Sequence, residues 1–196
     1  MPPEVRAFEY ATGLFAVLIG LAIVDLATSF HRLLRRSSIV RWDPLALMAA
    51  LYALCLVVAM WFDLWGVRHF DATRNFLFYL TFIAEFLILF LVAAASLPDQ
   101  PSEGADLREY YARTRRYLWT LLTLFQLLYV ADGLYFSRGE SVAIPRWALI
   151  ALNLLMFLPL LISLVLLAAK SRLVHFIGLG LLFLVMLAHY GAFSIN

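Results

Sequence analysis

The chain has 196 residues, of which 64% are hydrophobic and 14% are charged, and its mean hydropathy is +0.89. Because roughly 25% of the residues in an average soluble domain are charged, this composition excludes an ordinary soluble domain and indicates an integral membrane protein. The net charge is only +2 and the arginines flank apolar runs instead of forming one extended patch, so nucleic-acid binding is not predicted.

Six apolar runs follow one another, each near the roughly 20 residues that a helix needs to cross the hydrocarbon core. They cover residues 8–34, 45–66, 73–97, 116–136, 147–169 and 173–193. The runs are continuous, whereas the strands of a membrane barrel alternate polar and apolar residues over about 10 positions. We therefore predict an all-α membrane protein, a single domain folded as a six-transmembrane-helix bundle.

The first run carries Asp25 and ends in basic residues without a small-residue cleavage site, so it is predicted to remain as a helix. One side of this helix, at about 100° per residue, presents Glu9, Gly13 and Gly20. Small residues on one side allow close approach of another backbone, so this side is predicted to be a packing or partner face. Arg32 lies seven residues after Asp25, a spacing that suits a charge pair.

The third run contains Glu85 near its centre. An ionisable side chain at that depth costs on the order of 3 kcal/mol on insertion scales, and such groups usually face the bundle interior and often serve function. Thr81 lies one turn earlier on the same side, where it could hydrogen-bond to Glu85 or line a path with it.

The longest loop, residues 98–115, begins with prolines and continues with Asp106 and Glu109 in the spacing of a capping box. These residues predict a short, basic, tyrosine-rich helix at the cytoplasmic interface that leads into the fourth run. Two interpretations stay open. The segment is either an ordinary positively charged loop or a contact for a lipid or protein partner.

The last three runs carry isolated polar residues, Gln126, Asp132 and Asn153, and a helix-breaking Pro159. His175 and His189 are 14 residues apart, a spacing that resembles the histidine pairs of membrane b-type cytochromes. No partner helix repeats that spacing, so ordinary polar contacts are the preferred interpretation and no cofactor is predicted. The sequence also lacks a metal-ligand spacing, a phosphate loop and a nucleophile elbow, so we expect neither a metal site nor an enzyme.

Basic residues set the expected orientation, since they favour the cytoplasmic side of a membrane. They are twice as frequent around residues 35–44, 98–116 and 170–172 as in the alternate loops. Both termini are therefore predicted to lie outside. Tryptophans near the run ends are expected to form aromatic belts, Trp42 and Trp119 at the inner interface and Trp61, Trp65 and Trp147 at the outer one.

Several short motifs resemble an uncharacterised family of small bacterial six-span integral membrane proteins. They are Phe8-Glu9-Tyr10, Gly20-Leu21, Arg32-Leu33-Leu34-Arg35, the stretch 61–65, Leu97-Pro98, Asp106-Leu107-Arg108-Glu109-Tyr110-Tyr111 and Arg115-Arg116. The resemblance covers about the first two thirds of the chain. It implies the six-helix topology and a bacterial cytoplasmic membrane, and it transfers no functional site.

Two functional hypotheses follow. In the first, the protein is a channel or ion-coupled transporter for protons or small cations, and its pathway residues are Glu85, Asp25, Asp132, Gln126, Asn153 and Thr81. In the second, it is a non-catalytic scaffold or sensor subunit that binds a lipid or a protein partner through residues 98–115, with Tyr110, Tyr111 and Arg115 as contacts. Under either hypothesis a homo-oligomer is expected. The polar residues could instead serve as interhelical hydrogen bonds, worth about 1 kcal/mol each.

Overall fold

The computed structural model describes residues 3–66, 76–99, 104–137 and 146–191. These residues form six helices, one in each predicted apolar run, and no strand. The helices are α1 (Pro3–Arg35), α2 (Pro44–Gly66), α3 (Phe76–Ser96), α4 (Leu107–Ser137), α5 (Arg146–Ala168) and α6 (Arg172–Tyr190). The predicted all-helical class is confirmed.

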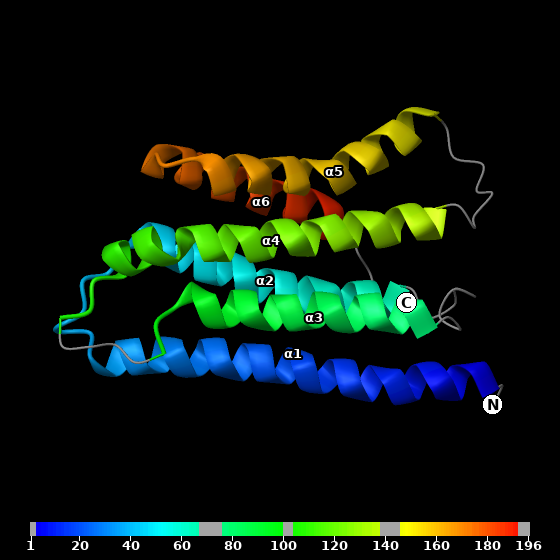
Figure 1. Cartoon of the computed structure of the whole chain (residues 1–196), viewed down its shortest axis with the longest axis horizontal. Coiled ribbons are helices and arrows are strands. Elements are labelled where there is room, and N and C mark those ends of the chain that lie inside the picture. The colour runs from blue at the N-terminus through cyan, green and yellow to red at the C-terminus, as the bar shows by residue number, and fades with distance from the viewer. Residues whose placement is uncertain (1–2, 67–75, 100–103, 138–145, 192–196) are drawn as a thin grey trace.

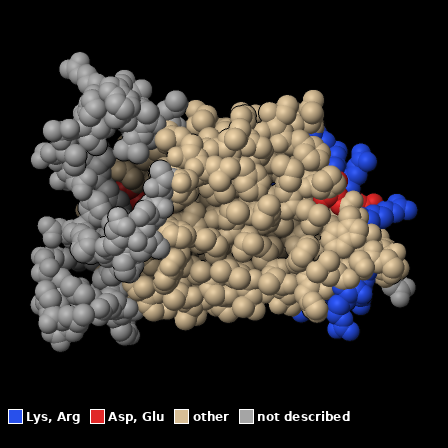
Figure 2. All heavy atoms as spheres, turned by 180° about the vertical axis from the view of Figure 1, so that it is seen from behind, with Lys and Arg blue, Asp and Glu red and all other residues tan. Residues whose placement is uncertain are grey.

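The helices lie side by side along one common direction, with α1 at one edge of the bundle and α5 and α6 at the other (Figure 1). Five of them, α1 to α4 and α6, contain stretches long and apolar enough to cross a membrane. The part of α5 whose side chains are described, Leu155–Ala168, is a shorter apolar stretch. Figure 2 shows lysines and arginines gathered at one end of the molecule and an uncharged belt along its middle. This arrangement supports an integral membrane protein.

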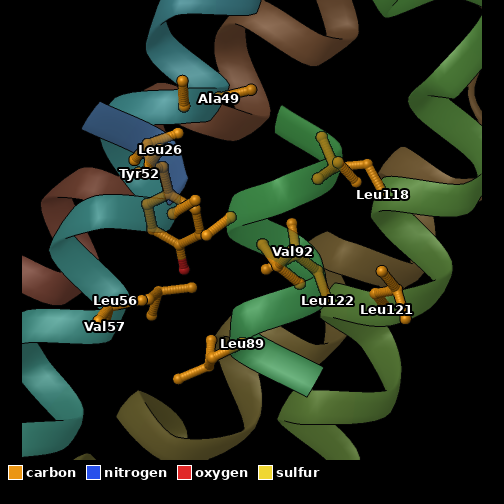
Figure 3. Packing of buried hydrophobic residues seen from close by; sticks show 14 of the residues in the cluster. Leu26, Ala49, Tyr52, Leu56, Val57, Leu89, Val92, Leu118, Leu121 and Leu122 are labelled. Atoms are coloured by element: carbon orange, nitrogen blue, oxygen red, sulfur yellow. The ribbon is translucent and has the colours of Figure 1, made fainter. Parts of the chain in front are cut away.

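Large aliphatic side chains cover much of the outside of this belt, for example Leu184, which is 62% exposed. Exposure of such an apolar surface to water is unfavourable, whereas its contact with lipid tails is not. Inside, all six helices contribute to one hydrophobic core, of which Figure 3 labels residues from α1 to α4. The core residues labelled there are Leu26, Ala49, Tyr52, Leu56, Val57, Leu89, Val92, Leu118, Leu121 and Leu122.

Helix α4 begins earlier than the fourth apolar run. The basic, tyrosine-rich segment that was predicted as a separate short helix forms the first turns of α4 itself, which runs unbroken from Leu107. Asp106 caps it as predicted, since its Oδ1 accepts hydrogen bonds from the backbone N–H groups of Arg108 at 2.8 Å and Glu109 at 3.1 Å. The Glu109 carboxylate accepts a hydrogen bond from Arg113, 2.5 Å away.

The small-residue side of α1 faces outward. Gly13 is exposed and Gly20 half-buried, and a methyl group built on either would meet no other atom within 4 Å. The side of α1 that packs on α2 and α3 is apolar and contains Phe15, Ile19, Ala22 and Leu26. No described helix of this chain therefore uses the glycine face, and its role toward a partner stays a prediction. The Glu9 side chain lies outside the described residues.

Candidate functional site

A cavity of about 50 Å³ lies between α2, α4, α5 and α6. Since one water needs roughly 10–15 Å³ measured in this way, the cavity has room for about three to five waters. Most of its wall is apolar. The polar side chains that line it are Tyr52, Asp63, Gln126, Tyr129, His189 and Tyr190.

Tyr52 and Gln126 form the deeper polar pair of this wall. Both side chains are buried, and they hydrogen-bond to each other. The Tyr52 ring also packs edge-on against Phe183, with ring centroids 5.4 Å apart. Its hydroxyl points along α2 toward the level of Leu56 (Figure 3). The pair satisfies two polar groups that would otherwise be unpaired inside the bundle.

Asp63 and two tyrosines form the second polar group of the cavity wall, near the end of α2 at Gly66. The Tyr190 hydroxyl donates a hydrogen bond to Asp63 Oδ2 at 2.5 Å, and Tyr129 hydrogen-bonds to both Asp63 and Tyr190. His189 lies close enough to attract the Asp63 charge, and its ring packs against Tyr190 with centroids 4.6 Å apart. Thus one carboxylate from α2 is held by hydroxyl groups from α4 and α6.

Pro159 shapes the α5 side of the cavity. As predicted from the sequence it lies inside a helix, and it lines the cavity together with Leu155, four residues earlier. A proline cannot donate to the carbonyl four residues before it, and its ring pushes that carbonyl away. Figure 1 shows α5 bending away from α4 toward its N-terminal end. The bend moves the first turns of α5 away from the cavity.

Two further acids lie near Asp63. Glu85 on α3 is 1% exposed, and its Oε1 has no hydrogen-bond partner among the described residues. Asp132 on α4 likewise has a buried, unpartnered Oδ2, and it forms a side-chain hydrogen bond with Thr81. The charges of both Asp132 and Asp63 act on Glu85. We name Asp63, Glu85 and Asp132 the outer acidic group, where outer denotes the end of the bundle opposite the one at which the lysines and arginines gather in Figure 2.

The residues predicted to share one pathway occupy separate places. Gln126 lines the cavity, whereas Glu85, Asp132 and Thr81 belong to the outer acidic group or its surroundings and are not part of the cavity wall. The Asn153 side chain lies outside the described residues. The predicted set therefore does not surround one common space in the described part of the chain.

Asp25 lies apart from the outer acidic group, in the last third of α1. Its Oδ2 is buried and unpartnered among the described residues, and Arg32 attracts its charge from along the helix, as predicted. Arg32 Nη1 itself donates to the backbone carbonyl of Asp99, 2.6 Å away, and Ser29 donates to the Asp99 carboxylate at 3.2 Å. These bonds join the end of α1 to the chain that follows α3.

The opposite end of the bundle, where the lysines and arginines gather, contains a hydrogen-bonded chain that we name the inner network after this end: Trp119, Tyr111, His175 and the Ala169 carbonyl. Trp119 Nε1 donates to the Tyr111 hydroxyl at 3.1 Å, which lies 2.8 Å from His175 Nδ1. His175 Nε2 lies 3.2 Å from the Ala169 carbonyl. Because a carbonyl can only accept, Nε2 carries the proton and Nδ1 accepts from Tyr111.

The inner network bears on the predictions made for Trp119 and His175. Trp119, expected in an aromatic belt, is 0% exposed, so its ring faces the bundle interior and does not contact lipid headgroups. Its N–H finds a partner inside the bundle, which removes the usual reason for a tryptophan to stay near water. His175 uses both ring nitrogens within the protein, which leaves none to bind a haem iron.

The residues considered for a partner contact in the 98–115 segment make bonds within the bundle. Tyr110 donates to the carbonyls of Ala95 and Leu97, each 3.1 Å away, and Arg115 donates to the carbonyl of Ala169. Tyr111 is buried in the inner network. A partner that binds this segment would have to use the exposed arginines of the first turns of α4, and such a partner stays a prediction.

Sequence reasoning did not single out Asp63, Tyr129 and Tyr190 as one site. Asp63 could have been found, because it is an acid inside an apolar run. The two tyrosines carry no such signal, since tyrosines are common near membrane interfaces.

The chain matches no protein-family model, no curated protein and no solved structure. Among the described residues, no group of three or more His, Cys, Asp or Glu side chains could hold a metal ion.

Proposed function

We propose that this protein is a six-span membrane protein, with both termini outside, that carries protons or small cations through its outer acidic group. The start of α4 then lies at the cytoplasmic interface. The observation that carries the proposal is the pair of buried carboxylate oxygens, Glu85 Oε1 and Asp132 Oδ2, that have no hydrogen-bond partner among the described residues.

The concentration of acids in this group supports charge transport. A single ionised carboxylate at bilayer depth costs several kcal/mol, and the outer acidic group combines three acids whose charges repel. A structural hydrogen-bond cluster would pair each oxygen with a donor. Unpaired oxygens in such a group are suited to take up and release a proton or a cation.

Asp63 connects this group with the cavity. It lines the cavity, and its charge acts on Glu85. Waters in the cavity would extend from Asp63 to Gln126, which lies about three helical turns before the end of α4 at Ser137. Proton transfer along such waters needs only hydrogen-bond contact at each step.

The test is proton flux into liposomes that contain the purified full chain, driven by a potassium diffusion potential and followed with a trapped pH-sensitive dye. Glu85→Gln removes the ionisable group and is expected to reduce the flux to the level of empty liposomes. The matched control is Glu109→Gln, because Glu109 is exposed and paired with Arg113 at the surface, and it should retain the parent flux. No flux with the parent protein, or an undiminished flux with Glu85→Gln, would refute the proposal.

A further inference from the structure

We propose that the cavity between α2, α4, α5 and α6 is a binding site for a small organic cation, a protonated amine with a short apolar body, and that Asp63 supplies its counter-charge. The inference rests on the proposed function in one respect, since both require a cation to reach Asp63. It goes further by naming the chemical class of the cation.

The charges around the outer end of the cavity favour a cation. Asp63 accepts hydrogen bonds from tyrosines, and a carboxylate has about four acceptor sites, so room for a further donor remains. Glu85 on α3 and Asp132 on α4 add negative charge nearby. Among the described residues, the basic side chain that interacts electrostatically with Asp63 is His189 on α6. The potential at this end of the cavity is therefore negative whenever the acids are ionised.

The remaining wall favours an organic ion over a bare metal ion. It includes Phe125 and the sulfur-bearing Met60, Met156 and Met186 besides aliphatic side chains. Hard metal cations need about six oxygen ligands around them, whereas the side-chain oxygens of this wall are divided between Asp63 with its two tyrosines at one end and Tyr52 with Gln126 at the other. Aromatic faces and methionine sulfurs instead suit the alkyl part of an ammonium ion.

The volume limits the ligand to a few non-hydrogen atoms. At 50 Å³ the space matches about three to five water-sized units, which a butylammonium ion with its five non-hydrogen atoms would fill. Ala59 lies one turn before Asp63 on α2 and lines the cavity with a single methyl group. A larger side chain at this position would occupy the space that the alkyl body needs.

The experiment measures binding of butylammonium to the purified full chain in detergent micelles by ligand-observed saturation-transfer NMR, with empty micelles as the blank. We expect saturable binding of butylammonium and at least tenfold weaker binding of n-butanol, its uncharged counterpart. Asp63→Asn should weaken butylammonium binding by about tenfold or more, as for one lost charge-assisted hydrogen bond. Ala59→Leu should also abolish binding while Asp63 stays in place. Glu109→Gln is the control and should bind like the parent.

Equal binding of butanol and butylammonium, or parent-like binding by Ala59→Leu, would overturn the inference. Because Asp63→Asn could unfold the chain, the thermal unfolding of each variant is compared with that of the parent, and Ala59→Leu provides the decision if Asp63→Asn is unfolded. The two proposals fail separately. Flux that depends on Glu85 without butylammonium binding refutes only the inference, whereas binding without any flux refutes only the proposed function.

Discussion

At the scale of single residues, the Tyr111 hydroxyl makes two buried hydrogen bonds in the inner network. It accepts from Trp119 and donates to His175, and both partners are buried. Tyr111→Phe would leave two buried polar groups unpaired, each at a penalty of about 1–3 kcal/mol. We expect a clear loss of unfolding free energy, measured by denaturation in mixed micelles.

The control for this change is Tyr117→Phe. Tyr117 lies on the same helix, is 52% exposed and should lose its hydroxyl without measurable effect. Equal stability of the two variants would show that the inner network contributes nothing to the fold.

Glu85 and Gln126 provide a second comparison between residues, because both are buried. Gln126 hydrogen-bonds to Tyr52, whereas Glu85 Oε1 has no hydrogen-bond partner among the described residues. Glu85→Leu removes an unpaired polar oxygen and should leave the unfolding free energy unchanged or raise it. Gln126→Leu leaves the buried Tyr52 hydroxyl unpaired and should lower it by about 1–2 kcal/mol. If Glu85→Leu proves as destabilising as Gln126→Leu, Glu85 has a structural role.

Residue type alone predicted that Glu85 would be buried, because an ionisable group inside an apolar run has few other places to go. The burial of Trp119 could not be predicted in the same way, because a tryptophan near the start of an apolar run is typical of an aromatic belt. Helix α4 begins at Leu107, before that run, so the Tyr111 hydroxyl about two turns earlier is in place to accept the Trp119 N–H inside the bundle.

At the scale of helices, one ion pair joins the beginnings of α2 and α6. Arg172 donates to Asp43 Oδ1 at 2.5 Å, while Asp43 Oδ2 accepts from the backbone N–H of Ala46 and so caps α2. Arg172→Ala would leave the buried Asp43 carboxylate without its counter-charge. The expected loss is about 2 kcal/mol of unfolding free energy, below that of a fully buried pair because the Arg172 side chain is 35% exposed.

The comparison for this pair is Arg113→Ala. Arg113 forms an exposed ion pair with Glu109, and such pairs contribute about 1 kcal/mol or less. Chemical denaturation of both variants decides the point. A larger loss for Arg113→Ala than for Arg172→Ala would contradict this account of how the helices are joined.

Two glycines distinguish a packed helix face from an open one. A methyl group on Gly178 of α6 would come within 2.6 Å of the Leu166 side chain on α5, whereas one on Gly20 of α1 meets nothing within 4 Å. Gly178→Ala should therefore destabilise by about 1–3 kcal/mol, and Gly20→Ala should be neutral or stabilising. Thermal unfolding measures both. A destabilised Gly20→Ala would reveal that a second chain packs on this side of α1.

At the scale of the whole molecule, the predicted orientation places residues 36–43 and 98–106 in the cytoplasm. In a Cys55→Ala background, Ser141→Cys should react with a membrane-impermeant maleimide in intact cells, whereas Ser37→Cys should react only after the cells are permeabilised. The reverse pattern would mean that the basic end lies outside. Labelling of both positions in intact cells would exclude an odd number of crossings between them.

The run lengths and the composition were sufficient to predict six helices, because the length of an apolar helix is set by the hydrocarbon thickness. The cavity was beyond such reasoning. It exists because α2, α4, α5 and α6 meet, and Asp63 and Tyr190 are far apart in the sequence but share a 2.5 Å hydrogen bond. The spacing of apolar and polar residues along one helix does not indicate which other helix its buried side will contact.

The central claim is that the outer acidic group acts as one unit in carrying charge. The most direct measurement compares proton flux in liposomes for the parent, Glu85→Gln, Asp132→Asn and the double variant. If the acids act together, Asp132→Asn should lower the flux as far as Glu85→Gln does, to the level of empty liposomes, and the double variant should match both. An Asp132→Asn variant that conducts like the parent while Glu85→Gln does not, or single variants that both conduct like the parent, would contradict the claim.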